Sequence, residues 1–318
     1  MKQLYYQLNE LLKSYYVFCA FDMATANTLL VQINDLRLQI AVLADQRQIF
    51  IDQFNIPADA SGYKRDFFFT HDDIDSCVIR GIAYLDEQAK VTLVQEGTRE
   101  NYFTRQPVAW QHLFSDVQRA TPLGQQIPFD FPQDIYLQKA ETLDIGVQGQ
   151  VDLGFIFIHG ANLPDNILPN KQNLLAEINL IEIDGRPNLP KPQLIPIQFK
   201  FTANATDNAA VAVDGAKDIY SIKNSRSVIL TEVSCTVNNM RTTLIDKGRD
   251  NTICESVDIQ GIAGYFEDAF TVYYPLPYPY LLRGQDRIQF KALNGGDVNT
   301  DPVDNTNVQT LCFRGYTL

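Results

Sequence analysis

The sequence offers only three histidines for metal binding or acid–base catalysis: His71, His112 and His159. A cupin-type metal site needs several imidazoles and a carboxylate on facing strands, in an HxH-type spacing. These histidines are single and far apart, so two such sites cannot be built from them. We interpret His159, which precedes Gly160 in an apolar run, as a residue near a strand end. His71, in "THDDID", is interpreted as part of a polar loop between strands.

Sequence signatures of nucleophilic and phosphate chemistry are missing as well. The chain has neither the GxSxG elbow of a serine hydrolase nor the GxxxxGK[ST] loop that holds phosphates. No cysteine lies near a histidine in the sequence. The chain holds 38 aspartates and glutamates, and any two could meet in the fold as the carboxylate pair of a glycoside hydrolase. A carbohydrate hydrolase is therefore one alternative, although we expect no catalytic site and no cofactor.

One acidic loop has the spacing of metal ligands. In "DVNTDPVDNTN", Asp297, Asn299 and Asp301 follow one another at every second position, as at the start of an EF-hand loop. Pro302 stands where the EF-hand requires glycine, and Val308 stands where it requires a bidentate glutamate. An EF-hand is therefore excluded. A looser structural Ca²⁺ site that adds Asp304 is the remaining metal hypothesis, against a solvated loop between the last two strands.

The first fifty residues are expected to form two amphipathic helices. Leucines and a tyrosine in "MKQLYYQLNELLKSYYVF" fall on one helical face, and Asp22 or Thr25 is a candidate cap for the second helix. The second helix carries a narrow apolar seam at spacings of four and three, formed by Leu29, Ile33, Leu36, Ile40 and Leu43. This seam needs an apolar partner, which is either the chain's own β domain, another subunit or a membrane.

Beyond Phe54 the residue pattern becomes that of a β protein. Short apolar and β-branched runs such as "CVIRGIAYL", "GFIFIHG" and "SVILTEVSCTV" alternate with clusters of Gly, Pro, Asn and Asp. Many short strands at this spacing predict a sandwich, barrel or jelly roll. We expect a helical arm over 1–50, a first β domain over 51–163, a proline-rich connector over 164–194 and a second β domain over 195–318. Within the connector, "LLAEINLIEID" is a candidate for an added strand.

Three pairs of short segments recur in the same order, which predicts an internal duplication. "TLVQEGTREN" resembles "TLIDKGRDN", with Gly97 matching Gly248 at an offset of 151. "IPFDF" resembles "LPYPY", with Pro128 matching Pro277 at an offset of 149. "FIFIHGANL" resembles the closing "TLCFRGYTL", at an offset of 155 between their glycines. The near-constant offsets indicate that one β unit occurs twice in the chain.

Bulk composition bounds the setting in which the protein works. Hydrophobic residues make up 45% of the 318-residue chain, enough for a sizeable core. A net charge of −12 argues against a protein whose task is to neutralise nucleic-acid phosphates. Five cysteines without CxxC spacing are typical of reduced thiols. With no signal peptide recognised at the N-terminus, we expect the chain to be made and folded in the cytosol.

The end of the chain has a recognisable order of elements. "YPYLLRGQDRIQFKALNGGD" and "VQTLCFRGYTL" give an aromatic–proline strand, a charged turn, an alternating strand, a loop and a closing apolar strand with glycine. This order resembles the last strands of viral jelly rolls. Two such units in tandem after a helical arm resemble the double jelly-roll major capsid proteins of tailless icosahedral phages with an internal membrane, such as the lipid-containing, Flavobacterium-infecting type.

That resemblance implies a mainly β fold of two tandem eight-stranded jelly rolls. It also implies a homotrimeric, pseudo-hexagonal capsomer that assembles with its neighbours into an icosahedral shell, so that the virion capsid is the expected location. The arm, with its seam Leu29 to Leu43, would face neighbouring capsomers, other capsid proteins or the internal membrane. The interfacial tyrosines of "YYQLNELLKSYYVF" favour membrane contact, but Lys2 and Lys13 provide only a thin basic face.

A glycan- or receptor-binding β module of a viral spike is the main alternative. The segment "FTVYYPLPYPYLL" packs six aromatic residues into 13 positions, and stacked tyrosines can bind sugar rings. The same residues also suit a core, or a proline-rich strand edge at a subunit contact. We favour the core or interface interpretation.

Overall fold

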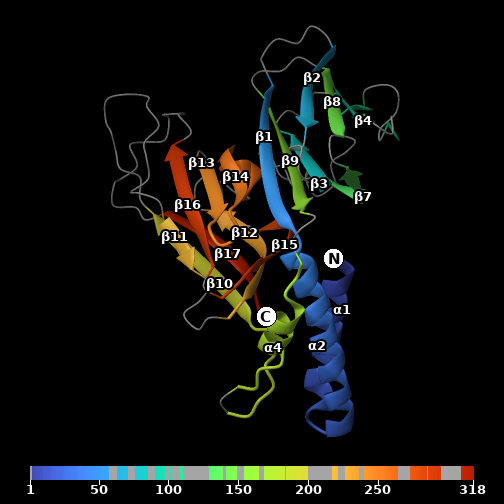
Figure 1. Cartoon of the computed structure of the whole chain (residues 1–318), viewed down its shortest axis with the longest axis vertical. Coiled ribbons are helices and arrows are strands. Elements are labelled where there is room, and N and C mark those ends of the chain that lie inside the picture. Colours follow the sequence, from blue (N-terminus) through green and yellow to red (C-terminus); the bar gives the residue numbers. More distant parts are fainter. Residues whose placement is uncertain are drawn as a thin grey trace.

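The chain is mainly β, with antiparallel sheets and a few helices (Figure 1). The computed structural model describes residues 2–56, 63–70, 76–84, 90–96, 100–101, 108–109, 129–138, 141–148, 154–164, 168–182, 184–199, 217–220, 226–235, 240–263, 273–284, 286–294 and 309–318. The strands divide into two groups along the chain. We call strands β1 to β9 the first unit and strands β10 to β17 the second unit.

Two helices form the N-terminal arm, as the spacing of the leucines predicts. Helix α1 is Lys2–Phe18 and helix α2 is Met23–Asp45. Asp22 is the N-cap of α2: its carboxylate accepts hydrogen bonds from the backbone N–H of Thr25, at 3.2 Å, and from the Thr25 hydroxyl, at 2.5 Å. These bonds satisfy donors that the first turn of a helix leaves open, so α2 begins where the sequence predicts.

Among the described residues, the first unit has nine strands in two sheets. One sheet has the order β1-β9-β3-β7, and the other has the order β2-β8-β4-β5, with β6 paired to β4. The strands are β1 (Gln48–Ile56), β2 (Tyr63–Thr70), β3 (Ser76–Tyr84), β4 (Lys90–Glu96), β5 (Glu100–Asn101), β6 (Val108–Ala109), β7 (Phe129–Leu137), β8 (Thr142–Gln148) and β9 (Gly154–Leu163). β1 therefore begins three residues before the expected domain start at 51.

In the described part of the second unit there are eight strands, also in two sheets. Their orders are β10-β17-β12-β15 and β11-β16-β13-β14. The strands are β10 (Pro192–Phe199), β11 (Lys217–Tyr220), β12 (Val228–Cys235), β13 (Met240–Asp246), β14 (Asn251–Asp258), β15 (Tyr274–Leu282), β16 (Arg287–Asn294) and β17 (Gln309–Thr317), with a 3-10 turn η2 (Ile259–Gly261) after β14. When the short β6 is set aside, both units share one strand order, which is first-eighth-third-sixth and second-seventh-fourth-fifth.

The two units also share an irregularity at equivalent positions. In the first unit, the register between β3 and β9 shifts just after the pair Ile79 and Gly160. In the second unit, the register between β12 and β17 shifts just after Leu230 and Gly315. The offset of 155 between the two glycines, expected from the sequence, is thus also the offset between two equivalent bulge positions.

The reason for glycine at both positions is close backbone approach. A Cβ atom on Gly160 would lie 2.6 Å from the carbonyl oxygen of Val78, and one on Gly315 would lie 2.0 Å from that of Ile229. Carbonyl oxygens in a paired strand cannot move aside as a flexible side chain can. Any larger residue would therefore have to part the central strands of its sheet.

A second match of the repeat has a structural counterpart, and a third does not. The hairpins β4–β5 and β13–β14 pair Gln95 with Glu100 and Asp246 with Asn251, which reproduces the expected offset of 151. The match of Pro128 with Pro277 is wrong by four residues. Ile79 pairs with Ile135, and the equivalent Leu230 pairs with Tyr280, so the offset in these strands is 145.

The connector between the units also differs from the expectation. Its segment "LLAEINLIEID" adds no strand to a sheet: residues Lys171–Ile178 form helix α4, capped by the side chain of Asn170, and Ile181 only bridges Pro187. Glu177 of α4 accepts hydrogen bonds from the backbone N–H and the hydroxyl of Ser227, both at 2.9 Å. The helix is therefore tied to the start of β12.

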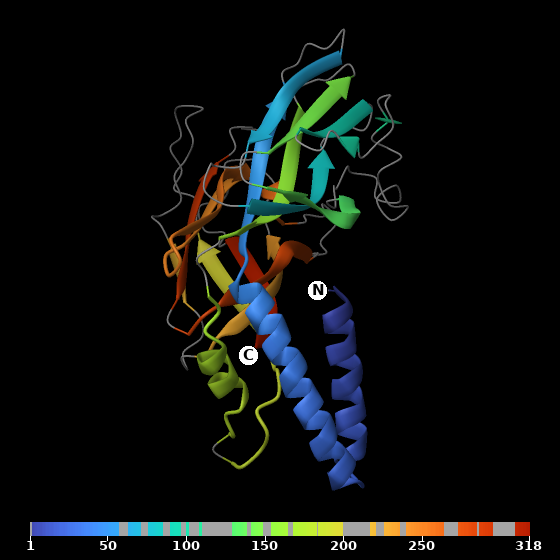
Figure 2. The ribbon, with the colours of Figure 1, turned by 45° about the vertical axis from the view of Figure 1, so that its right-hand side comes forward.

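The arm lies at one end of the molecule. Figures 1 and 2 show α1 and α2 side by side as a hairpin beneath the sheets, with α4 beside the upper half of α2. The turn between α1 and α2 forms the lower tip of the molecule, remote from β2 (Figure 2). Both the N-terminus and the C-terminus lie where the hairpin meets the second unit (Figure 1).

We expect Gly315→Ala to lower the free energy of unfolding by about 2–3 kcal/mol, because the added methyl group overlaps the carbonyl of Ile229. Urea denaturation followed by circular dichroism measures the change, and Gln198→Ala, on the exposed face of neighbouring β10, is the control. Equal midpoints for the two variants would contradict the close approach.

Candidate functional site

A row of apolar residues joins the two units. Ile49, Ile51 and Phe157 are each 1% exposed and belong to the same buried cluster as the core of the second unit. They point away from the interior of their own unit, because alternate residues such as Phe50 and Ile158 face the other side of the sheet. One face of the sheet β1-β9-β3-β7 thus packs on the edge of the second unit, at β14 and β15.

Polar contacts fix the register of this packing. Gln53 donates a hydrogen bond to the Asp258 carboxylate and accepts one from the Asp258 backbone N–H, both at 2.6 Å. The side-chain amide of Asn251 donates to the carbonyl oxygen of Ile49 at 3.3 Å. Apolar packing alone tolerates sliding, whereas these directional bonds fit only one alignment of β1 against β14.

Tyr278 contacts the first unit through both its hydroxyl and its ring. Its hydroxyl donates to the Asp134 carboxylate of the first unit at 2.5 Å. The guanidinium groups of Arg47 and Arg80 lie 4.3 and 5.4 Å from its ring centroid, within cation–π distance. Burial, and then the hydrogen bond to Asp134, raise the pKa of Tyr278, so the phenol stays protonated and remains a donor.

The arm is held against the second unit by a separate apolar cluster. It comprises residues of α1, α2, α4, the connector, β12, β15 and the last residue of the chain: Leu8, Ile33, Leu36, Ile40, Ala41, Ala44, Leu174, Ile178, Leu189, Ile229, Leu281 and Leu318. The expected seam is therefore occupied mainly by this chain's own residues. Ile33, Leu36 and Ile40 are buried, and Leu29 and Leu43 at its ends are partly exposed.

A buried ion cluster locks the end of α2 in place. Asp45, the last residue of α2, accepts hydrogen bonds from Arg283 at 2.7 and 3.0 Å, and it lies 3.4 Å from Arg249. Arg249 is in turn 3.7 Å from the carboxylate of Asp246, which accepts a hydrogen bond from Tyr280. The side chains of Asp45 and Asp246 have no exposed surface. Each buried carboxylate is thus paired, as burial of a charge demands.

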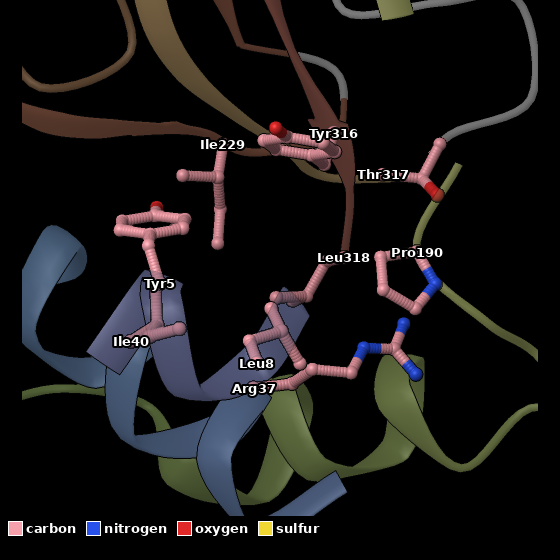
Figure 3. A pocket seen from close by; sticks show the side chains of 9 residues that line it. All are labelled: Tyr5, Leu8, Arg37, Ile40, Pro190, Ile229, Tyr316, Thr317 and Leu318. Atoms are coloured by element: carbon pink, nitrogen blue, oxygen red, sulfur yellow. The ribbon is translucent and has the colours of Figure 1, made fainter. Parts of the chain in front are cut away.

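A cavity of ≈ 20 Å³ remains where the arm meets the second unit (Figure 3). Tyr5 and Ile40 lie on one side of it, and the guanidinium of Arg37 points toward Pro190 on the other. Arg37 donates to the side chain of Asn34 and to the carbonyl of Asn188. Burial, and then Arg226, lower the pKa of Arg37 to about 10, and its charge persists at neutral pH. The cavity has room for no more than a water-sized molecule.

The far end of the arm is exposed and apolar. Tyr16, Val17, Phe21 and Met23 are each between 56% and 71% exposed, and they flank the turn between α1 and α2. Residues 14–21 carry no charged side chain. An open groove of ≈ 520 Å³ runs along the hairpin between α1 and α2, with Tyr6, Leu11 and Leu36 among its lining residues.

Of the residues that the sequence offers for metal or acid–base chemistry, His159 lies in the part of the chain that the structure describes. The acidic loop with Asp297, Asn299, Asp301 and Asp304 lies outside the described residues, as do His71 and His112. His159 is buried on β9, opposite Ile51. Within the described ranges, no three His, Cys, Asp or Glu side chains come together in a way that could hold a metal ion. Of the helices described, none has the length and apolarity for a bilayer crossing.

Sequence reasoning missed the charged residues beneath the arm. Arg37 follows Ile33 by four positions and therefore shares its helical face, which was the available signal. Asp45 lies at the end of the same face, four positions beyond the buried Ala41. Arg37 has one local partner, Asn34, but nothing in the sequence linked either residue to its distant partners, which come from the connector and from loops of the second unit more than 100 residues away.

Comparison with known proteins gives no family assignment. No family model matches the chain, and no curated protein matches it. Among solved structures, the PBSX exported protein XepA is similar at 14% identity and a TM-score of 0.23, over 86% of this chain and 87% of that one. A structure of infectious bursal disease virus, Gx strain, is similar at 9% identity and a TM-score of 0.18, over 85% of this chain and 69% of that one. Likenesses this weak carry no argument.

We expect Asp45→Ala to destabilise the protein by about 3–5 kcal/mol, because it leaves Arg249 buried without one of its carboxylates. Differential scanning calorimetry provides the measurement. The matched control removes the carboxylate of an exposed ion pair: Glu10→Ala, whose partner is Lys13, should leave the melting temperature unchanged. A loss no larger than that of the control would show that the cluster does not hold the arm.

Proposed function

We propose that this protein is a structural shell subunit, a viral major capsid protein built from two jelly rolls in tandem. The observation that carries the proposal is the repeated strand order, in which each unit pairs its first strand with its last and its second with its second-to-last. The double Greek key of a jelly roll would produce this strand order, which therefore supports the proposal. The shared bulge, with Gly160 and Gly315 at matching positions, supports a common origin for the two units.

The packing of the units suits a rigid tile. An apolar row, two hydrogen bonds between Gln53 and Asp258, and the Tyr278–Asp134 bond connect them. A weakly held pair of domains would rotate about its linker, because small polar domain interfaces allow such motion. A lattice built from many identical subunits needs the same shape in each, and this interface supplies the stiffness.

The edge strand β10 is suited to controlled assembly. Pro192 and Pro196 stand in it, and both are exposed. Proline offers no backbone donor, so a strand of another chain cannot simply extend this sheet. Association would then proceed through side-chain surfaces, which can be specific for one partner. The net charge of −12 further disfavours indiscriminate self-association.

We also propose that the exposed tip of the arm faces a lipid surface inside the particle. The tip places Tyr16, Val17, Phe21 and Met23 at the end of the molecule, with no charge between Lys13 and Asp22. Aromatic and aliphatic side chains of this kind insert at the level of the headgroups. Because basic residues are absent from the tip, the attraction would be apolar and insensitive to salt.

The shell proposal requires the particle-building unit to be a trimer. The purified chain should elute as a trimer, with a mass of about three times 36.0 kDa by light scattering coupled to size exclusion. Negative-stain images of the trimer should show a tile with six lobes, two from each chain. A chain that remains monomeric at the highest concentrations reached would contradict the shell proposal.

The lipid proposal requires the exposed tip of the arm to bind vesicles. The full chain should float with neutral phosphatidylcholine vesicles, equally at low and high salt. The double variant V17D/F21D should lose at least about four-fifths of that binding, because two charges would have to enter the apolar layer. Leu168→Asp changes a leucine elsewhere that is 88% exposed, and this variant should bind like the unchanged chain. Failure of the unchanged chain to float would rule out the lipid contact.

A further inference from the structure

Each residue that β1 and β9 of the first unit contribute to the interface has an equivalent on the outer sheet face of the second unit. In the first unit, Ile51 lies opposite His159, which lies opposite Gly81. At the same positions of the second unit, Leu194 lies opposite Arg314, which lies opposite Glu232. The two rows are equivalent because each is adjacent to the bulge glycine, Gly160 or Gly315, in its closing strand.

The two rows differ sharply in burial. Ile51 is 1% exposed because it packs against the second unit, whereas Leu194 is 61% exposed. The same contrast holds one register step away. Ile49 is buried, and its equivalent Pro192 is exposed. The second unit therefore presents, uncovered, the surface that the first unit covers within the chain.

The neighbouring part of the same sheet face is already occupied. Ile229 and Leu281 are buried under the helical arm, and the ring of Tyr316 stacks on Tyr5 with centroids 6.5 Å apart. The uncovered part is the row further along the strands, where Arg314 forms an ion pair with Glu232 and lies 4.4 Å over the ring of Tyr273. We call the surface formed by Pro192, Leu194, Pro196, Glu232 and Arg314 the free face.

We propose that the free face binds the first unit of a second copy of this chain. The partner surface is the strand edge β5–β7, which is equivalent to the edge β14–β15 that the first unit covers within the chain. This inference rests on the proposed shell function and identifies the contact that would build its trimer. The contact is head-to-tail: the second unit of one copy meets the first unit of the next. Such contacts close into a ring when the rotation between copies permits it.

A second copy fits the free face better than a lipid surface does. The face combines an apolar leucine and two prolines with a charged pair, Arg314 and Glu232, which a bilayer would have to desolvate. An aliphatic centre with a charged residue at its side is the usual composition of a protein interface. The chain itself already provides the complementary shape once, where β14 and β15 receive Ile49 and Ile51.

Light scattering of Leu194→Asp tests the contact. The variant should weaken association by about 100-fold, because a leucine is lost from the contact and an unpaired carboxylate takes its place. At concentrations where the unchanged chain is a trimer, the variant should be a monomer with an unchanged melting temperature. Leu168→Asp, at another highly exposed leucine, is the matched control and should remain trimeric.

The outcomes separate this inference from the shell proposal. A monomeric unchanged chain would overturn both. A trimer that persists in Leu194→Asp would leave the shell proposal standing and overturn the free face as its contact.

A disulfide trap tests the contact without depending on the stability of the leucine variant. Within the chain, Asn251 donates to the carbonyl of Ile49. The equivalents of these two residues are Glu100 and Pro192, at offsets of 151 and 143. The variant P192C/E100C, made in a C19S background to remove the exposed native thiol, should form linked dimers and trimers on mild oxidation.

Controls for the trap use the same two positions. P192C and E100C alone should give no ladder on a non-reducing gel, nor should the displaced pair L168C/E100C. Efficient trapping by the displaced pair, or none by P192C/E100C in a trimeric sample, would refute the proposed pairing of surfaces.

Discussion

The structure depends on one constraint: the sheet β1-β9-β3-β7 is apolar on both faces. Phe50 and Ile158 fill the interior of the first unit, while Ile49, Ile51 and Phe157 point out of it. A sheet of this kind cannot leave either face in water without exposing several large side chains, each worth about 1.5–3 kcal/mol on burial. The second unit provides the missing cover, so the two units cannot behave as independent domains on a flexible linker.

Polar groups stabilise the contact between the units, and the contact between the arm and the second unit, in a different way from apolar groups. Buried ion pairs such as Asp45 with Arg249 and Arg283 add little net stability over an apolar replacement, because desolvation offsets the attraction. They do penalise every arrangement in which a charge loses its partner. If α2 were rotated about its axis it would still bury leucines, but it would leave Asp45 without donors or Arg37 without acceptors. The charged groups therefore fix the position of the arm.

Local patterns in the sequence were sufficient for the parts of the fold that depend on local chemistry. The cap Asp22 and the seam from Ile33 to Ile40 follow from spacing alone, because capping and helical periodicity act within a few residues. Two offsets of the repeat were also correct. For the offset of 155 the reason is that Gly160 and Gly315 meet the same steric requirement. Errors arose where letters are ambiguous. Strand β15 holds three prolines among its aromatic residues, and Pro128 stands just before β7, so the residue types alone permitted an alignment that was wrong by four residues.

The sequence could not show which element packs on the outer face of each unit's sheet. In this respect the first and second units differ. Ile229 and Leu281 of the second unit lie under the arm, whereas Val78, the equivalent of Ile229, is buried against the second unit. Tyr136, the equivalent of Leu281, is 48% exposed. The equivalent sheet face is therefore covered by the second unit in one case and by the helical arm in the other. In the second unit the arm covers only one end of this face, and Leu194 at the other end is 61% exposed. In the proposed head-to-tail contact this exposed end meets the first unit of a second copy, so the asymmetry gives the chain a direction from one unit to the next.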